Sequence, residues 1–154
     1  MHTIEHMGED CWTPTNGDPN DGLRYMNNPT SDGYSVDHYS KYPQQTEVHG
    51  SSGICNNAFY QLAETDDAHK EANSVSHIAV KGGIGIEKAA KIFFRALIHY
   101  MTPNTSFSGA RDACIHAATD LFGADSVELA KVKEAWSAVG VESKAAPATA
   151  EKIS

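Results

Sequence analysis

The composition of the chain changes near residue 50. Up to about Gly50 the chain is crowded with Asn, Asp, Gly, Pro, Ser and Tyr, a composition typical of turns and loops. From Ser51 onward apolar residues recur with the period of an α-helix. We therefore predict a mainly α fold, in which a helical bundle over residues 51–142 carries a loop-rich segment, residues 1–50, laid across it. The small and polar residues 143–154 are predicted to be a disordered tail.

Four helices are expected in the second half of the chain. Proline and glycine punctuation together with hydroxyl-bearing capping residues defines their ends. The expected ranges are from Ser51 to just before Thr65, 86–101, from near Ser106 to Gly123, and from Asp125 or Ser126 to Val139.

Three finer features of these helices are also predicted. Glu128 is placed to complete a capping pair at the start of the last helix. Residues 66–83 are polar and aperiodic, so we expect an exposed loop there. The second helix is expected to bury one apolar stripe, made of Ile86, Ala89, Ala90, Phe93, Phe94, Leu97 and Met101.

Charge and length exclude some classes of protein. The chain has 154 residues, of which 40% are hydrophobic, enough for one domain with a core. Its formal charge of −8 argues against nucleic acid and anionic membranes as partners. No apolar run approaches the roughly 20 residues that span a bilayer, and no signal peptide is recognisable. Three widely spaced cysteines allow at most one disulfide bond and form no zinc knuckle.

The eight histidines do not form a recognisable metal site. The zinc-protease motif His-Glu-x-x-His is absent, and the pair His2 and His6 has its glutamate on the wrong side. The other histidines are interpreted as helix-boundary residues (99 and 116) or solvated loop residues (69 and 77). Only His38 and His49 are therefore left as candidates for catalysis. From the residues alone we predict no metal ligand within this chain.

His49 is the stronger candidate because Glu47 stands two residues before it. A carboxylate at this spacing can hold the imidazole in one tautomer and favour its protonated form, and such a ring can donate to a transition-state oxyanion. Arg24 offers a guanidinium fork for a substrate carbonyl or carboxylate. From the residues alone, the plainer interpretation is an ordinary polar contact for His49 and a loop salt bridge for Arg24.

A series of segments in order resembles the thermolysin family of zinc metalloendopeptidases. Together the segments cover roughly nine-tenths of the chain and correspond to the C-terminal, mainly helical domain of that family. The first ones are Gly8-Glu9-Asp10-Cys11-Trp12-Thr13-Pro14, Leu23-Arg24-Tyr25-Met26-Asn27-Asn28-Pro29, Asp37-His38-Tyr39-Ser40-Lys41-Tyr42 and Val48-His49-Gly50-Ser51-Ser52-Gly53-Ile54. Later ones include Lys91-Ile92-Phe93-Phe94-Arg95-Ala96-Leu97, Ala117-Ala118-Thr119-Asp120-Leu121-Phe122-Gly123 and Ala135-Trp136-Ser137-Ala138-Val139-Gly140-Val141.

The resemblance implies roles for five residues in peptide-bond hydrolysis. His49 is similar to the histidine that stabilises the tetrahedral oxyanion. Arg24 is similar to the arginine that binds the substrate carbonyl on the leaving-group side of the scissile bond. Leu23 resembles a wall residue of the apolar pocket that receives the side chain after that bond, and Met7 and Cys11 fall at other apolar wall positions.

The residue that orients the histidine differs between branches of the family. Thermolysin-like members place an aspartate five residues before the histidine, where this chain has Gln44. Vibriolysin-like members place an acid two residues before it, where this chain has Glu47. We therefore assign the orienting role to Glu47.

The resemblance also implies cofactors, partners and a location. The family's zinc ligands and general base belong to a preceding domain, so we expect zinc to be held outside this chain and the chain alone to be inactive. Glu9 matches one calcium-binding acid of the family, whereas Ile4 and His6 replace others, so a calcium ion is possible and a double site is not expected. The implied partners are a peptide substrate and the N-terminal catalytic domain, and the implied location is extracellular. A non-catalytic binding or structural remnant of the domain is the alternative, and an unrelated helical metal-binding protein is a third.

Overall fold

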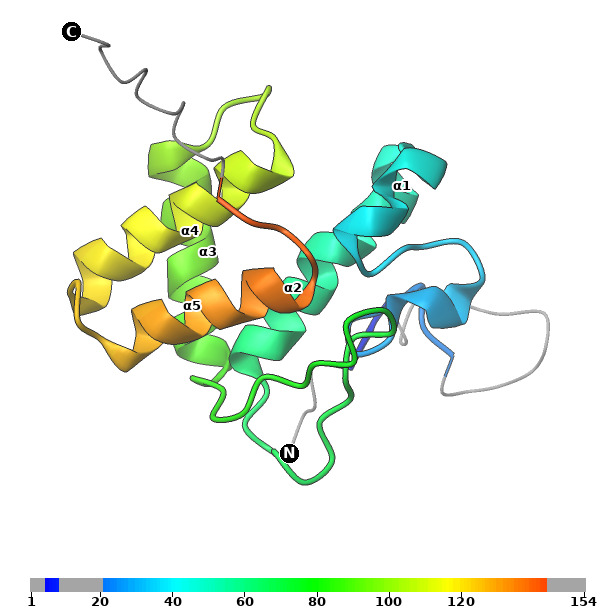
Figure 1. Ribbon diagram of the computed structural model, residues 1–154, viewed down its shortest axis with the longest axis horizontal. Helices are drawn as coiled ribbons and strands as arrows, with labels where there is room; N and C mark the ends of the chain where they lie inside the picture. The colour runs from blue at the N-terminus through cyan, green and yellow to red at the C-terminus, as the bar shows by residue number, and fades with distance from the viewer. Residues whose placement is uncertain (1–4, 9–20, 144–154) are drawn as a thin grey trace, which may run out of the picture.

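Four long helices carry the fold in a computed structural model that describes residues 5–8 and 21–143 (Figure 1). They are α2 (Gly53–Ala63), α3 (Ile86–Tyr100), α4 (Phe107–Phe122) and α5 (Val127–Ala138). All four predicted helices are present within a few residues of their expected bounds, and the predicted mainly α fold is confirmed. The predicted tail lies outside the described residues, apart from its first position.

The core lies where the four helices meet. The helix α4 packs against both α3 and α5, and α5 also packs against α2. Trp136 on α5 is 1% exposed and stacks on Phe93 of α3, which in turn meets Phe59 of α2 edge to face. The last helix buries one apolar side, since Leu129, Val132 and Trp136 of α5 and the following Val139 are all buried. Cys55 and Cys114 are free thiols.

Serine side chains cap the last two helices, and of the two starts expected for the last helix Ser126 is the cap. Ser106 Oγ accepts a hydrogen bond from the Gly109 backbone N–H at 3.2 Å, and Ser126 Oγ accepts one from Leu129 N–H at 3.1 Å. The capping pair predicted for Glu128 is wrong. This residue is the second of α5, one short of the position from which a carboxylate reaches back to the cap, and it pairs instead with Lys88 of α3 at 2.6 Å.

The apolar stripe predicted for the second helix is partly wrong. The helix α3 buries Ala89, Ile92 and Ala96, whereas Phe94 is 64% and Leu97 60% exposed. Apolar residues extend almost around this helix, so two stripes rotated about its axis fit the same helical period. Packing against α4 selects the stripe with the smaller side chains.

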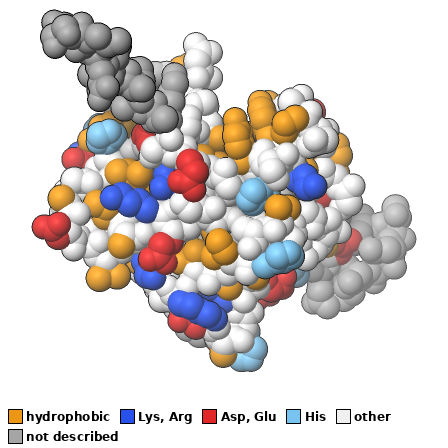
Figure 2. All heavy atoms as spheres, viewed as in Figure 1, with side chains coloured by type: hydrophobic (Ala, Val, Ile, Leu, Met, Phe, Trp, Pro, Cys, Tyr) orange, Lys and Arg blue, Asp and Glu red, His pale blue; other side chains and the backbone are white. Residues whose placement is uncertain are grey.

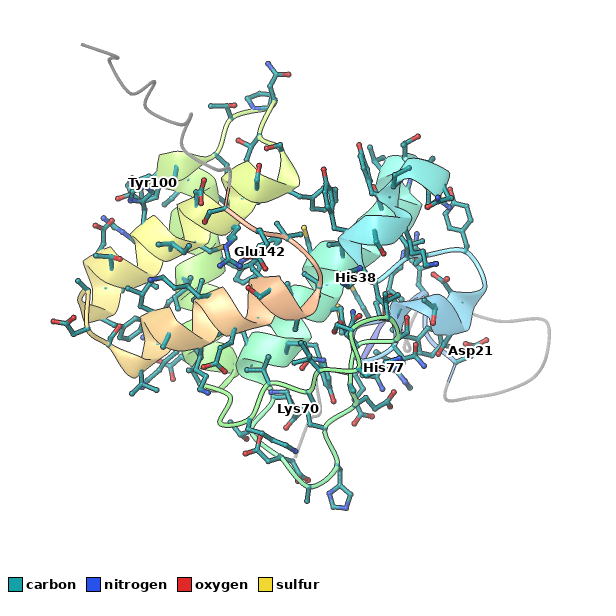
Figure 3. All side chains as sticks on the ribbon, viewed as in Figure 1. Asp21, His38, Lys70, His77, Tyr100 and Glu142 are labelled. Carbon is teal, nitrogen blue, oxygen red and sulfur yellow. The ribbon has the colours of Figure 1, made fainter. Side chains whose placement is uncertain are left out.

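The connection between α2 and α3 is more buried than predicted. It contains neither helix nor strand, yet Lys70 is only 8% exposed. The Lys70 ammonium donates to the carbonyl oxygens of Gln61 at 2.7 Å, Glu64 at 2.9 Å and Val80 at 2.5 Å, and it lies beneath the end of α2 (Figure 3). Burial lowers the pKa of Lys70 to about 8. The Lys70 ammonium thus supplies hydrogen-bond donors to carbonyl groups at the end of α2, where the helix itself has no N–H groups left to pair with them.

The first half of the described chain consists of short elements. Strands β1 (His6–Met7) and β2 (Arg24–Tyr25) pair antiparallel, with Met7 opposite Arg24. The 3₁₀ helices η1 (Pro29–Asp32) and η2 (Tyr39–Gln44) and the short helix α1 (Val48–Ser51) follow. This confirms the loop-rich character predicted for this half, although His49 lies inside α1 and not before the first helix.

A buried asparagine attaches these short elements to the bundle. Asn57 of α2 is 0% exposed, and its Nδ2 donates to the carbonyls of Met26 at 3.1 Å and Asn27 at 3.0 Å. Its Oδ1 accepts from Asn73 Nδ2 at 3.0 Å. The segment directly after β2 is thereby fixed on α2, which sets the position of Arg24.

The surface is mixed in charge. On the face drawn in Figure 2, Lys and Arg side chains are interspersed with Asp and Glu, without a large basic patch. Among the described residues, no helix combines the length and the apolar character needed to cross a membrane.

Candidate functional site

Glu47 and His49 form a pair at the start of α1. Glu47 is the N-cap residue, and its Oε2 accepts from the backbone N–H groups of His49 at 2.9 Å and Gly50 at 3.2 Å. Its Oε1 lies 2.7 Å from His49 Nδ1. The capping geometry fixes the carboxylate against the ring. Nδ1 therefore bears the hydrogen that is donated to Glu47, and Nε2 is left for another partner.

The pair lies at the surface. The His49 side chain is 72% and the Glu47 side chain 45% exposed. A hydrogen bond from Tyr34, followed in weight by the one from His49, lowers the pKa of Glu47 to about 2. Glu47 is therefore a carboxylate at any physiological pH and accepts the hydrogen bond from His49 Nδ1 as an anion.

Tyr34 is a third member of this cluster, and sequence reasoning missed it. Its hydroxyl donates to Glu47 Oε2 at 2.6 Å, a charge-assisted hydrogen bond. This same hydrogen bond raises the pKa of Tyr34, so the hydroxyl stays protonated. Tyr34 lies 13 residues before Glu47 in the chain, and no local pattern in the sequence connects the two.

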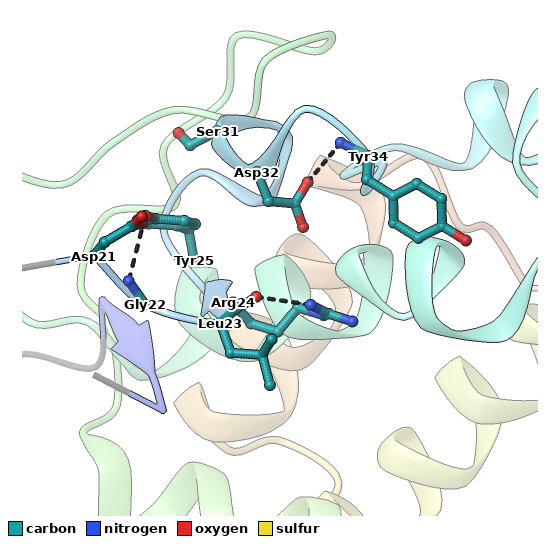
Figure 4. A pocket seen from close by; sticks show the side chains of 8 residues that line it. All are labelled: Asp21, Gly22, Leu23, Arg24, Tyr25, Ser31, Asp32 and Tyr34. Carbon is teal, nitrogen blue, oxygen red and sulfur yellow. Dashed lines mark hydrogen bonds between the residues drawn. The ribbon is translucent and has the colours of Figure 1, made fainter. Parts of the chain in front are cut away.

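Arg24 and Leu23 line a cavity of about 300 Å³ (Figure 4). The other residues around it are Asp21, Gly22, Tyr25, Ser31, Asp32 and Tyr34. The Arg24 guanidinium donates through Nη1 to the Leu23 carbonyl at 2.7 Å, which leaves its other N–H groups for a ligand or solvent. Leu23 is 42% exposed. The cavity thus joins a basic group to an apolar side chain.

The predicted site residues are only partly brought together. Arg24 and Leu23 share the cavity, and Tyr34 connects it to Glu47 and His49 because it lines the cavity and binds Glu47. Met7 pairs with Arg24 across the β1–β2 ladder but does not line the cavity, so its role stays a prediction. Cys11 and Glu9 lie outside the described residues.

His38, the other candidate from the sequence, has a structural position. It is the N-cap residue of η2, and its Nδ1 accepts from the Ser40 backbone N–H at 3.2 Å. Burial lowers the pKa of His38, which favours the neutral ring. The ring also lies against Gly140, where a β-carbon would overlap it.

A second cavity, of about 370 Å³, lies between η2, α2, α3 and α4. Its lining is mostly apolar and includes Tyr39, Tyr42, Leu97, Met101 and Phe107. None of the predicted site residues borders it.

Metal ligands do not gather anywhere in the part of the chain that the structure describes. Residues 5–8 and 21–143 contain no group of three His, Cys, Asp or Glu side chains that could hold a metal ion. The described residues therefore do not form a zinc site.

Comparison with known proteins identifies the family. Residues 3–141 match the family model described as "Thermolysin metallopeptidase, alpha-helical domain". The chain is 43% identical over 139 residues to "Thermostable neutral protease NprT" from Geobacillus stearothermophilus and 44% identical over 140 residues to "Bacillolysin" from Bacillus cereus. "Neutral protease B" from Bacillus subtilis (strain 168) is 40% identical over 139 residues.

These alignments cover one part of the relatives. Each spans 88% of this chain but only 23–24% of the relative. The matched part of each is the α-helical domain that the family model describes, in agreement with the bundle α2 to α5. The chain therefore belongs to the thermolysin metallopeptidase family, in which it corresponds to the C-terminal, α-helical domain.

Proposed function

We propose that this chain forms the C-terminal part of a zinc metalloendopeptidase that hydrolyses peptide bonds. The relatives are proteases by name, and the observation that carries the proposal is the exposed His49 ring held by Glu47 at 2.7 Å. The chain supplies an oxyanion-stabilising imidazole and a substrate-binding arginine. The segment of the relatives that this chain does not span supplies the general base and the zinc ligands.

The role of His49 follows from the charge that develops during amide hydrolysis. When water attacks the scissile carbonyl carbon, the carbonyl oxygen becomes an oxyanion. The protonated His49 ring donates from Nε2 to that oxygen, while Nδ1–H stays on Glu47 Oε1. Zinc bound outside the described residues would act as a Lewis acid. Because the ring is oriented before reaction, its hydrogen bond strengthens in the transition state without a reorganisation cost.

Arg24 and Leu23 bind the substrate beyond the scissile bond. The Arg24 guanidinium has N–H donors besides the one on the Leu23 carbonyl, and because an arginine is not deprotonated in proteins it suits a peptide carbonyl. Leu23 offers an apolar wall for the side chain that enters the cavity. This pair binds ground state and transition state alike, so its loss should raise KM more than it lowers kcat.

We also propose an extracellular location and a calcium ion at Glu9.

The proposal is tested in a chimeric protease. Residues 3–141 of this chain replace the matching segment of the Bacillus cereus bacillolysin, and hydrolysis of a peptide substrate is measured. Loss of one oxyanion donor lowers kcat by about 10²–10³-fold, and we expect this for His49→Ala. The matched control is His69→Ala, because His69 forms the same kind of pair with Asp66 at 2.8 Å but in the loop between α2 and α3.

The alternative is a non-catalytic binding or structural remnant. A chimera that folds, as judged by circular dichroism and a cooperative unfolding transition, but lacks activity would support this alternative. Equal activity of the His49→Ala and His69→Ala chimeras would also contradict the catalytic role of His49. If the chimera does not fold, the same two variants are compared in a protease reassembled from this chain and the separately expressed N-terminal segment of the relative.

A further inference from the structure

The Glu47 carboxylate divides its two oxygens between two partners of different kinds. Oε1 faces His49 Nδ1 at 2.7 Å, and Oε2 accepts the Tyr34 hydroxyl at 2.6 Å in addition to two backbone N–H groups. Rotation of the carboxylate away from the imidazole would break the hydrogen bond to Tyr34. The orientation of the ring is therefore coupled to a residue on a different segment of the chain.

The Tyr34 backbone is itself held on both sides. Its N–H donates to Asp32 Oδ1 at 2.8 Å, and its carbonyl accepts from Gln45 Nε2 at 3.0 Å. The Gln45 side chain packs against α1, because a β-carbon on Gly50 would lie 2.6 Å from Gln45 Cδ. Tyr34 is thus connected to Glu47, the N-cap residue of α1, through its hydroxyl and to Gln45 through its carbonyl.

Tyr34 also borders the cavity of Arg24 and Leu23 (Figure 4). Among the described residues, it is the one that both lines this cavity and contacts the Glu47–His49 pair. Tyr34 can therefore contact both a ligand in the cavity and the carboxylate that orients His49.

We propose that Tyr34 is a positioning residue that fixes the Glu47 carboxylate and, through it, the His49 ring. The inference rests on the proposed function, because it assigns to Tyr34 a part in the same reaction. A purely stabilising role explains the contact less well, since Tyr34 is 47% and the Glu47 side chain 45% exposed, and hydrogen bonds in contact with water add little to folding stability.

The chemistry of the contact fits this role. The phenol donates to the carboxylate and so keeps it ionised, as the pKa of Glu47 at about 2 indicates. An ionised carboxylate can accept the Nδ1–H of the imidazole, and this hydrogen bond keeps Nε2 directed away from Glu47, toward the place where it would donate to the oxyanion. The other charged groups that influence Tyr34 are Arg24 and Asp32 at the cavity, and Tyr34→Phe leaves both in place.

The first experiment measures titration in the 154-residue chain by NMR. The carboxyl ¹³C shift of Glu47 and the ring ¹⁵N shifts of His49 are followed against pH in the wild type, in Tyr34→Phe and in the control Tyr39→Phe. We expect Tyr34→Phe to raise the midpoint of the Glu47 titration by about one pH unit and to lower the Nδ1–H tautomer fraction of neutral His49. The His69–Asp66 pair is the internal reference, because its shifts should not change.

The second experiment is a double-mutant cycle in the chimeric protease. Tyr34→Phe should lower kcat about tenfold, well below the 10²–10³-fold effect of removing the oxyanion donor, with KM unchanged. Tyr34→Phe combined with Glu47→Gln should be no slower than Glu47→Gln alone, because a residue that acts through Glu47 has no further effect once the carboxylate is gone. Tyr39→Phe should keep the wild-type rate.

The outcomes separate this inference from the proposed function. An unchanged Glu47 titration in Tyr34→Phe, or additive effects of the two substitutions on kcat, would overturn the positioning role even if His49→Ala inactivates the chimera. A folded but inactive wild-type chimera would instead overturn the proposed function, whatever the titration of Glu47 shows. A raised midpoint together with a non-additive loss of kcat would support both.

Discussion

Asn57→Asp tests whether the buried asparagine fixes the cavity segment on α2. The substitution changes one NH₂ group to an oxygen and leaves the shape of the side chain almost unchanged. Asn57 Nδ2 donates to two carbonyls, those of Met26 and Asn27, at 3.1 and 3.0 Å, in a place with 0% exposure. The introduced carboxyl has one donor when it is protonated and none when it is ionised, so at least one of the two buried acceptors loses its partner.

The magnitude follows from these contacts. Leaving a buried carbonyl without a donor costs about 1–3 kcal/mol. A buried carboxyl must also either bind a proton or remain ionised at the cost of its desolvation. We therefore expect Asn57→Asp to lower the free energy of unfolding by about 3–5 kcal/mol at pH 7. For a domain of this size that lowers Tm by about 6–20 °C. Asn56→Asp is the control, because Asn56 lies one residue earlier on α2 and is partly exposed.

The dependence on pH gives a second and independent test. Burial raises the pKa of the introduced carboxyl in the folded state above its unfolded value of about 3.9. The folded variant then binds more protons than the unfolded one between these two values, so its stability falls as the pH rises through that interval. Relative to the wild type, the variant should recover about 1.4 kcal/mol for each unit of pH lowered within it.

Urea unfolding at pH 7 and pH 4.5 measures both effects, and hydrogen exchange of residues 22–27 reports the release of the cavity segment. A loss no larger than that of Asn56→Asp would refute the reasoning. A loss that does not depend on pH would show that the introduced carboxyl is not buried.

Two further substitutions test the packing around the site. Gly140→Ala should destabilise the fold by about 2–4 kcal/mol, because Gly140 has φ +75° and a β-carbon would overlap the His38 ring. The control Gly33→Ala, at φ +70° with open space, should lose only about 1–2 kcal/mol. Equal losses in thermal unfolding would contradict the overlap. Lys70→Met removes the donor to three carbonyls and should cost about 1–3 kcal/mol, against no measurable change for the exposed Lys91→Met. Because the pKa of Lys70 is lowered to about 8, the unfolded chain binds more protons above that pH, so wild-type stability should rise from pH 8 to pH 10 and the rise should be absent in Lys70→Met.

The helices could be predicted because their signals are local. Ser106 and Ser126 cap α4 and α5 as their side chains predict, and Gly123 follows the last residue of α4. The buried face of α3 could not be predicted, because apolar residues lie on both candidate faces and only the contact with α4 decides between them. For the same reason the burial of Lys70 was missed. Its partners Gln61 and Val80 are nine and ten residues away, beyond the range of any periodic pattern.

The candidate site shows the same division between local and long-range information. Glu47 and His49 meet because an N-cap carboxylate necessarily lies beside the first turn of its helix, so a spacing of two residues is enough to predict the pair. The position of Arg24 depends instead on β1 and on Asn57, which is more than thirty residues away from the strand it supports. No local pattern in the sequence predicts the position of Arg24, and only the resemblance to the thermolysin family indicated a substrate-binding role for it.

Two histidine–carboxylate pairs in this chain show what local sequence leaves undecided. His69 lies 2.8 Å from Asp66, and His49 lies 2.7 Å from Glu47, so distance and chemistry do not distinguish them. The difference lies in the third partner: only the carboxylate of Glu47 receives a hydroxyl from a residue that also lines the cavity of Arg24. An exposed histidine that pairs with a nearby acid is common and carries little information. A pair whose acid is oriented by a distant segment requires the folded chain, and that requirement is the physical argument for proposing a catalytic role for His49 and not for His69.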